Sequence, residues 1–394
     1  MPVCPEKKLR LYLVTAFISL LIFLLSAEVL VRSFLPFNTP DTIRKYSLQY
    51  IGSIFARHRL KPMGQTVEED SDKALGKKGK NEEPAGRFFI NDVGYRGPNF
   101  SKRKPQGIKR IIIIGGSTVF DINATDETAS ETRDWPHLVE RFLRNKGYNN
   151  VEVINAGIPG HASFDSLGRL YSQLWMYEPD YVLFYGAWND IVYFRKLTLE
   201  SPLISLYAPY YPNSNPYIEY QGLLDRFLSS SQLYVKLRNQ YYSWKHPVGK
   251  EGVIPQGEYQ DTYSAYAVRQ YRLNVELIVD TCRNIKAVPI LLTEATIVSP
   301  DNSADERKMI GYVYPRLTHA ALVRALDEAG QVIRSVVQEK KVAFIDLAKE
   351  LNGKRDLFID GIHLSTKGGE EVATRVADFL ASQLKEKSNA RNFD

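Results

Sequence analysis

Hydrophobic residues near the start of the chain form one long run. Leu11–Ala27 contains no charged residue and follows a short segment with three basic residues. A helix rises 1.5 Å per residue, so this run, extended to Val31, is long enough for the roughly 30 Å hydrocarbon layer of a bilayer. We therefore expect residues 11–31 to be a transmembrane anchor that contacts the lipid bilayer, behind a short cytoplasmic tail at residues 1–10.

A cleaved signal peptide is the alternative, because a basic segment before an apolar stretch is typical of both. No small-x-small cleavage motif stands at Leu25–Glu28, and the run is longer than the apolar region of a typical signal peptide. The basic cluster Lys7–Arg10 favours a cytoplasmic N-terminus, with the large remainder on the periplasmic or cell-surface side. Glu28 and Arg32 are four residues apart and can pair at the membrane boundary.

The next part of the chain is polar. We expect residues 32–108 to be a juxtamembrane and linker segment. Within it, residues 64–86 carry mixed charges and almost no large apolar side chains. Such a composition predicts an exposed, flexible loop.

From Lys109 onward, short apolar runs alternate with longer amphipathic segments. This alternation predicts a parallel sheet covered by helices on both faces, a three-layer α/β/α domain over residues 109–386 followed by a tail at residues 387–394. The expected strands are 110–114, 151–155, 181–185, 287–292 and 342–346, and the expected helices are 134–147, 264–284, 318–339 and 366–385.

A further helix is expected between the second and third of these strands. Ser163 is a suitable cap, and Pro179 ends the helix. Five apolar residues are spaced so that they share one helix face. They are Phe164, Leu167, Leu170, Leu174 and Trp175.

Residues 195–261 interrupt the alternation with a long insertion rich in tyrosine and proline. Long insertions between core elements are often binding loops or lids. Tyrosines such as Tyr207, Tyr234 and Tyr242 could stack on sugar rings, or they could be packing residues that keep their hydroxyl groups wet. The sequence leaves both interpretations open.

Composition narrows the class of protein. The 394 residues are 44% hydrophobic and 24% charged, which is typical of a globular chain and excludes disorder or a coiled coil over its whole length. Lys+Arg exceed Asp+Glu by 51 to 45 without a basic patch, so we expect no nucleic-acid partner. Two cysteines cannot form a disulfide framework, and no His, Cys and Asp cluster has ligand spacing, so we expect neither metal nor cofactor.

Three motifs that could carry chemistry follow expected strands or precede the last helix. Gly115-Gly-Ser117 follows the first strand, where a serine could be a nucleophile. Asp360-Gly-Ile-His363 precedes the last helix, and a histidine oriented by an aspartate could take the proton of that serine. Gly157 and Asn189 follow the second and third strands, where an amide N–H and a side-chain amide could stabilise an oxyanion.

In this order, Ser117, Gly157, Asn189 and His363 resemble the four marker residues of the SGNH (GDSL-like) hydrolases. The resemblance covers about Lys109–Lys385. It implies the SGNH/flavodoxin-like version of the three-layer fold, a nucleophile at Ser117, a general base at His363 and a role for Asp360 in orienting that base. It also implies an oxyanion hole made by the Ser117 N–H, the Gly157 N–H and Asn189.

Two further sequence features bear on this resemblance. The segment Asn91–Gly97 is similar to the entry segment of membrane-anchored bacterial members. Gly116 stands where the family often has aspartate, and Ala187 stands where it usually has glycine. Neither difference removes a catalytic group, but both mark divergence from the secreted lipases of the family.

The expected function is a serine esterase that removes small acyl groups, with O-acetyl as one candidate, from a carbohydrate or another envelope ester. An O-acyltransferase with the same three residues is the first alternative, because transfer differs from hydrolysis only in water exclusion and acceptor binding. A non-catalytic glycan-binding or assembly protein on the same fold is the second, since fold alone does not prove activity.

Overall fold

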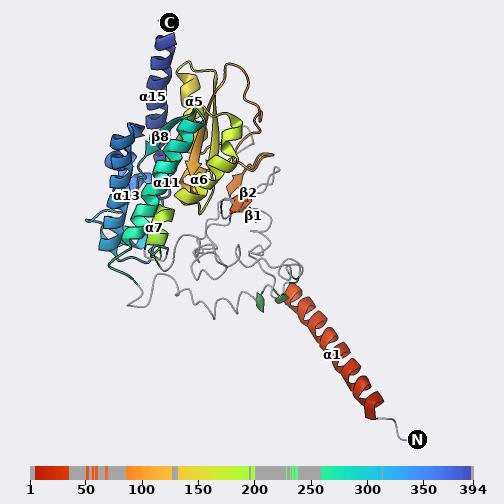
Figure 1. The fold of residues 1–394 in the computed structure, drawn as a ribbon. Helices are drawn as coiled ribbons and strands as arrows, with labels where there is room; N and C mark the ends of the chain where they lie inside the picture. Colours follow the sequence, from red (N-terminus) through yellow and green to blue (C-terminus); the bar gives the residue numbers. More distant parts are fainter. Residues whose placement is uncertain are drawn as a thin grey trace. The chain divides into compact units, whose positions relative to one another are not determined.

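The structure is a computed structural model of the chain (Figure 1). It describes residues 5–34, 50–52, 56, 58–60, 67–69, 86–126, 132–194, 197–199, 228, 231, 233–234, 236–237, 259–312 and 314–391. The chain divides into two compact units, one formed by residues 1–48 and 209–248 and the other by residues 49–208 and 249–394.

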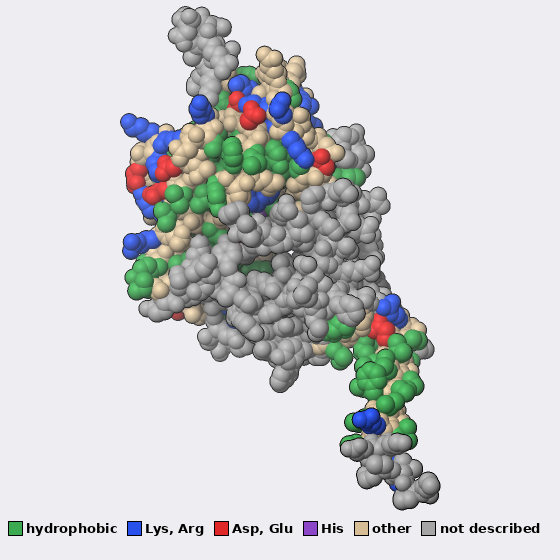
Figure 2. Space-filling model, turned by 45° about the vertical axis from the view of Figure 1, so that its right-hand side comes forward, with side chains coloured by type: hydrophobic (Ala, Val, Ile, Leu, Met, Phe, Trp, Pro, Cys, Tyr) green, Lys and Arg blue, Asp and Glu red, His purple; other side chains and the backbone are tan. Residues whose placement is uncertain are grey.

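Helix α1 (Pro5–Phe34) contains the apolar run. Its stretch Lys8–Ser33 is long and apolar enough to cross a membrane, and only 6% of its most apolar window is buried within the protein. Hydrophobic side chains gather along the middle of the visible surface of this helix, and charged side chains lie nearer its ends (Figure 2). The predicted pair at its end is confirmed, because Arg32 Nε donates to Glu28 Oε1 at 2.7 Å.

The sheet of the larger unit is parallel, as predicted, and has five strands in the order β6-β5-β7-β8-β9. The central strand β5 carries Ile111–Ile114, which are all buried, because the sheet is covered on both faces. The strands are β5 (Lys109–Gly115), β6 (Val151–Gly157), β7 (Tyr181–Tyr185), β8 (Val288–Leu292) and β9 (Ala343–Ile345).

Helices cover the two faces of this sheet in the way that right-handed crossovers require. The chain leaves β5 in one direction to reach β6 and then in the other to reach β7, so the connecting helices lie on opposite faces. α5 (Trp135–Asn145) packs against α15 (Thr366–Arg391). α6 (Ser163–Ser172), α11 (Ala265–Asn284) and α13 (His319–Lys340) lie side by side on the other face (Figure 1).

Several short elements complete the described part of the larger unit. Two small antiparallel sheets pair β1 with β2 and β3 with β4. The remaining elements are β1 (Tyr50–Gly52), β2 (His58–Leu60), β3 (Val67–Glu69), β4 (Gly86–Phe88), α4 (Ser117–Phe120), η1 (Leu174–Tyr177), α7 (Trp188–Phe194), α12 (Ala304–Met309), α14 (Leu347–Leu351) and η3 (Arg355–Leu357).

The helix expected after β6 differs from the prediction. Ala162, and not Ser163, is the cap residue, and α6 ends at Ser172. The chain continues as the 3₁₀ helix η1, which turns every 3.0 residues instead of 3.6. This tighter turn moves Trp175 away from the buried face, and Trp175 is 45% exposed.

Other predicted boundaries also shift. Trp188–Phe194, which is not among the helices expected from the sequence, forms helix α7. Strand β3 lies inside the expected loop at residues 64–86, because backbone pairing with β4 does not require apolar side chains. The last helix was expected to end at residue 385 but extends to Arg391, so it includes part of the expected tail. Most of the polar loop and of the insertion at residues 195–261 lies outside the described residues.

Candidate active site

The candidate site lies where the strand order reverses. The order β6-β5-β7-β8-β9 has the flavodoxin-like pattern, in which the first strand in the sequence is flanked by the second and third. In such sheets, ligands bind at the carboxyl ends of the first and third strands, because the connections there diverge to opposite faces. Ser117 follows β5 after one residue, Gly116, and Asn189 lies just past β7, so both lie at this switch point.

Three of the predicted site residues form a hydrogen-bonded series. Ser117 Oγ lies 2.8 Å from His363 Nε2. On the other side of the imidazole ring, His363 Nδ1 lies 2.6 Å from Asp360 Oδ2. The serine can therefore give its proton to one ring nitrogen while the carboxylate accepts a hydrogen bond from the other.

The Asp360 carboxylate is held in place by the backbone of its own loop. Asp360 Oδ1 accepts the N–H groups of Ile362 at 2.9 Å and His363 at 2.8 Å. Burial by itself would raise the pKa of Asp360, but the hydrogen bond from the His363 ring and these N–H groups outweigh it, so the pKa is lowered. The carboxylate is therefore ionised at neutral pH and fixes the ring orientation of His363.

Asn189 lies beside the turn that leads to the serine. Its Nδ2 atom donates to the carbonyl oxygen of His161 at 2.8 Å. A Cβ atom on Gly116 would be 2.6 Å from Asn189 Nδ2 and 3.0 Å from His161 O. The Asn189 amide thus occupies space that is free only because residue 116 is a glycine. The aspartate that SGNH hydrolases often have at this position would not fit this arrangement.

Gly157 is the predicted site residue whose surroundings differ most from expectation. Its N–H group donates to Asn155 Oδ1 at 3.0 Å. A Cβ atom at this position would be 2.3 Å from Phe120 N, so Gly157 allows α4 to lie close against β6. To act on an oxyanion, its N–H would first have to leave Asn155, and its place in the oxyanion hole stays a prediction.

The buried side chain of Arg96 contacts the C-terminal end of α4, the helix that begins with Ser117. Its guanidinium donates to the carbonyl oxygens of Phe120 at 2.7 Å and Asp121 at 2.6 Å, where α4 ends. It also pairs with Asp126 at 2.6 Å and with Asp134 at 3.5 Å. Burial by itself would lower the pKa of Arg96, but these carboxylates raise it, so the guanidinium is charged.

We expect Arg96→Met to lower the free energy of unfolding by about 3–5 kcal/mol, because Asp126 would stay buried without its cationic partner and the carbonyl oxygens at the end of α4 would lose their donor. Urea unfolding of the detergent-solubilised full chain measures this change. Arg103→Met, at an exposed position, is the matched control and should change the value by less than about 0.5 kcal/mol. Equal unfolding midpoints for Arg96→Met and wild type would contradict the support that we assign to Arg96.

Sequence reasoning missed two side chains next to the predicted site, Thr118 and Glu294. Glu294 is half-buried and accepts a hydrogen bond from the Thr118 hydroxyl at 2.8 Å. The sequence did contain one signal for Glu294, which is an acidic residue just past the end of a buried strand, β8. Among the described residues, no group of three or more His, Cys, Asp or Glu side chains could hold a metal ion.

Solved structures similar to this chain have low sequence identity to it. The lipase/acylhydrolase from Enterococcus faecalis is 18% identical, with a TM-score of 0.41 over 70% of this chain and 97% of that one. An acetylxylan esterase from Geobacillus stearothermophilus is 15% identical, with a TM-score of 0.39 over 69% and 93%. An α/β hydrolase enzyme from the metagenome of Lake Arreo is 14% identical, with a TM-score of 0.39 over 69% and 94%.

Comparison by sequence gives a second result. No curated protein matches the chain significantly. A model of the GDSL-like lipase/acylhydrolase family, however, matches residues 113–370, which is more than half of the chain. The matched range includes Ser117, Asn189, Asp360 and His363.

Proposed function

The chain belongs to the GDSL-like lipase/acylhydrolase family, and on that premise we propose that it is a serine esterase that hydrolyses small acyl esters, such as O-acetyl esters of carbohydrates or other envelope molecules. The observation that carries this proposal is the series of two short hydrogen bonds, 2.8 Å from Ser117 Oγ to His363 Nε2 and 2.6 Å from His363 Nδ1 to Asp360 Oδ2.

Acylation follows from these distances. As Ser117 Oγ attacks the ester carbonyl, its proton moves to His363 Nε2, and the Asp360 carboxylate stabilises the imidazolium that forms. The tetrahedral intermediate then loses the alcohol, which takes the proton from His363 Nε2. The acyl group stays on Ser117 Oγ.

Deacylation repeats the same proton transfers with water. His363 Nε2 takes a proton from the attacking water, and the new tetrahedral intermediate releases the carboxylic acid. Ser117 Oγ regains its proton from His363. A sugar hydroxyl in place of water would instead give the acyltransferase reaction.

Asn189 is proposed to stabilise the oxyanion in both steps. A side-chain amide has two N–H donors, and the carbonyl oxygen of His161 takes one of them at 2.8 Å. That bond orients the amide and leaves its second hydrogen for the substrate oxygen. As the first residue of α4, Ser117 also has an N–H group without an acceptor inside its helix.

Removing this donor gives a testable result. We expect Asn189→Ala to lower kcat by roughly 10²–10³-fold, because the donor acts mainly on the charge that develops in the transition state. Steady-state kinetics with p-nitrophenyl acetate measure the change. Asn150→Ala, at the opposite ends of the strands, is the control and should keep the wild-type kcat. Undiminished kcat in Asn189→Ala would exclude this residue from the oxyanion hole.

We also propose that α1 is an uncleaved anchor at residues 11–31 and that residues 109–386, the esterase domain, face the periplasm or cell surface. Support comes from the apolar side chains of α1, such as Phe17 and Phe23, which are 64% and 67% exposed without a bilayer. Intact-mass analysis of the protein from washed membranes tests whether the mature chain keeps the apolar helix. A mature chain that begins after residue 27 would instead identify a signal peptide.

The esterase proposal is tested by labelling and by product analysis. A fluorophosphonate probe should add one adduct to the wild type and none to Ser117→Ala. Incubation with acetylated sugars should then release free acetate. If a sugar acceptor is added and becomes acetylated, the enzyme is instead a transferase. Absence of labelling in folded wild-type protein would reject both reactions and favour a non-catalytic binding protein.

A further inference from the structure

Glu294 connects the loops at the ends of three neighbouring strands. It follows β8, and its Oε1 atom accepts the Thr118 hydroxyl at 2.8 Å at the end of β5. Its Oε2 atom accepts the backbone N–H groups of Ala187 at 2.7 Å and Trp188 at 2.6 Å, at the end of β7. One half-buried carboxylate thus contacts both sides of the switch point.

Two of the three groups that donate to Glu294 belong to residues adjacent in the sequence to a proposed reactive residue. Thr118 directly follows Ser117, and Trp188 directly precedes Asn189. Ser117 is the first residue of α4, which has four residues, and Asn189 is the second residue of α7, which has seven. Helices this short have few hydrogen bonds of their own to fix their first turns, so outside contacts must determine where these turns lie.

We propose that Glu294 is a positioning residue that fixes the Ser117 nucleophile and the Asn189 amide relative to each other. This inference rests on the proposed esterase function, in which both groups act on the same carbonyl. A shift of about 1 Å between groups that act on one reacting centre can cost on the order of 10²-fold in rate. A single rigid bridge between the two turns would prevent such a shift.

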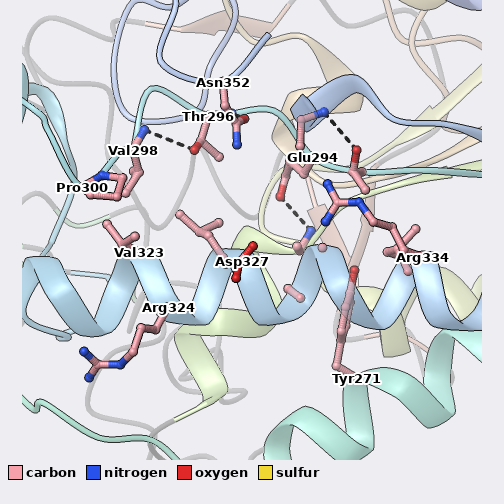
Figure 3. A pocket seen from close by; sticks show the side chains of 17 residues that line it. Tyr271, Glu294, Thr296, Val298, Pro300, Val323, Arg324, Asp327, Arg334 and Asn352 are labelled. Atoms are coloured by element: carbon pink, nitrogen blue, oxygen red, sulfur yellow. Dashed lines mark hydrogen bonds between the residues drawn. The ribbon is translucent and has the colours of Figure 1, made fainter. Parts of the chain in front are cut away.

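The surroundings of Glu294 show how its removal could be tolerated by the fold. Its side chain lines a cavity of about 310 Å³ together with Tyr271, Asp327 and Arg334 (Figure 3). A dashed line in Figure 3 marks a hydrogen bond that the Glu294 carboxylate accepts. The space freed by a shorter side chain would join this cavity, whose lining includes the polar side chains of Asp327 and Arg334 among apolar ones. Water there can satisfy the freed N–H groups, so Glu294→Ala has a route to a folded state.

Glutamine can replace this carboxylate almost group for group. Gln Oε1 can accept the N–H groups of Ala187 and Trp188, and Gln Nε2 can donate to Thr118 Oγ1. Glu294→Gln therefore keeps the bridge and removes only its charge. A bridge that acts through geometry predicts that glutamine restores what alanine loses.

The experiment compares Glu294→Ala and Glu294→Gln with wild type in the full chain, in detergent. We expect Glu294→Ala to lower kcat for p-nitrophenyl acetate roughly 10²-fold and to leave KM within about threefold, because substrate binding does not need the alignment that the transition state needs. The rate of fluorophosphonate labelling of Ser117 should fall in parallel. Glu294→Gln should keep kcat within about fivefold of wild type.

Glu152→Ala is the control for a general loss of stability. Glu152 pairs with the buried Arg110 at 2.6 Å, at the opposite ends of the strands. We expect this variant to lower the thermal midpoint and to keep kcat at temperatures where it is folded. The inference is wrong if Glu294→Ala keeps the wild-type kcat, if glutamine is as damaging as alanine, or if loss of activity only follows the thermal midpoint as in the control.

The two levels of proposal fail in different ways. Wild-type protein that neither labels nor hydrolyses esters would reject the esterase function, and with it the role of Glu294. Active wild-type protein together with a fully active Glu294→Ala variant would reject the role of Glu294 alone.

Discussion

Ser117→Ala and His363→Ala should each lower kcat on the order of 10⁶-fold, and the double variant should be hardly less active than either single variant. The reason is that, in the proposed mechanism, the two groups carry out one step: Ser117 Oγ attacks while His363 Nε2, 2.8 Å away, accepts its proton. Removing either group ends that step, so removing the second has little left to affect.

Acetate release by the two single variants and the double variant, each at high enzyme concentration, tests this non-additivity. His319→Ala is a suitable control, because His319 bonds to Tyr312 and to the carbonyl oxygen of Ser299 and belongs to no proposed step. It should keep kcat near wild type. Losses that multiply in the double variant would mean that Ser117 and His363 act independently, against the proposed mechanism.

Asp360→Asn should lower kcat by roughly 10⁴-fold even though the two side chains have almost the same shape. Asp360 Oδ1 accepts the backbone N–H groups of Ile362 and His363, so the carbonyl oxygen of an asparagine would occupy that position. Its NH₂ group would then face His363 Nδ1, which now lies 2.6 Å from a carboxylate oxygen. An amide that donates to Nδ1 places the ring proton on Nε2.

A ring protonated at Nε2 cannot accept the Ser117 proton, so the loss is expected in kcat rather than in folding. The ¹⁵N chemical shifts of the His363 ring would report the tautomer directly, beside steady-state kinetics. Asp356→Asn is the matched control, since Asp356 pairs only with the exposed Lys367 among the described side chains. An Asp360→Asn variant with wild-type kcat would show that a different group orients His363.

The order of strands and helices could be predicted from the sequence because it depends on local periodicity. The strand at Tyr181–Tyr185 and the helix at Ala265–Asn284 lie where the apolar pattern predicts them. Trp175 was misplaced because a change from α to 3₁₀ geometry leaves no clear trace in apolar spacing. Strand β3 was missed because its pairing with β4 is a backbone contact that its side chains do not signal.

For the candidate site, the sequence by itself determined which chemical groups are available and that they follow the ends of strands. Ser117, Asn189, Asp360 and His363 could be selected because nucleophile, base and donor chemistry needs these residue types. Tertiary structure alone decided their partners. It places His363, 246 residues along the chain, 2.8 Å from Ser117, gives the Gly157 N–H to Asn155, and uses Glu294 to hold two strand ends. Hydrogen bonds depend on distances and angles set by the packing of the whole sheet, and sequence spacing does not contain them.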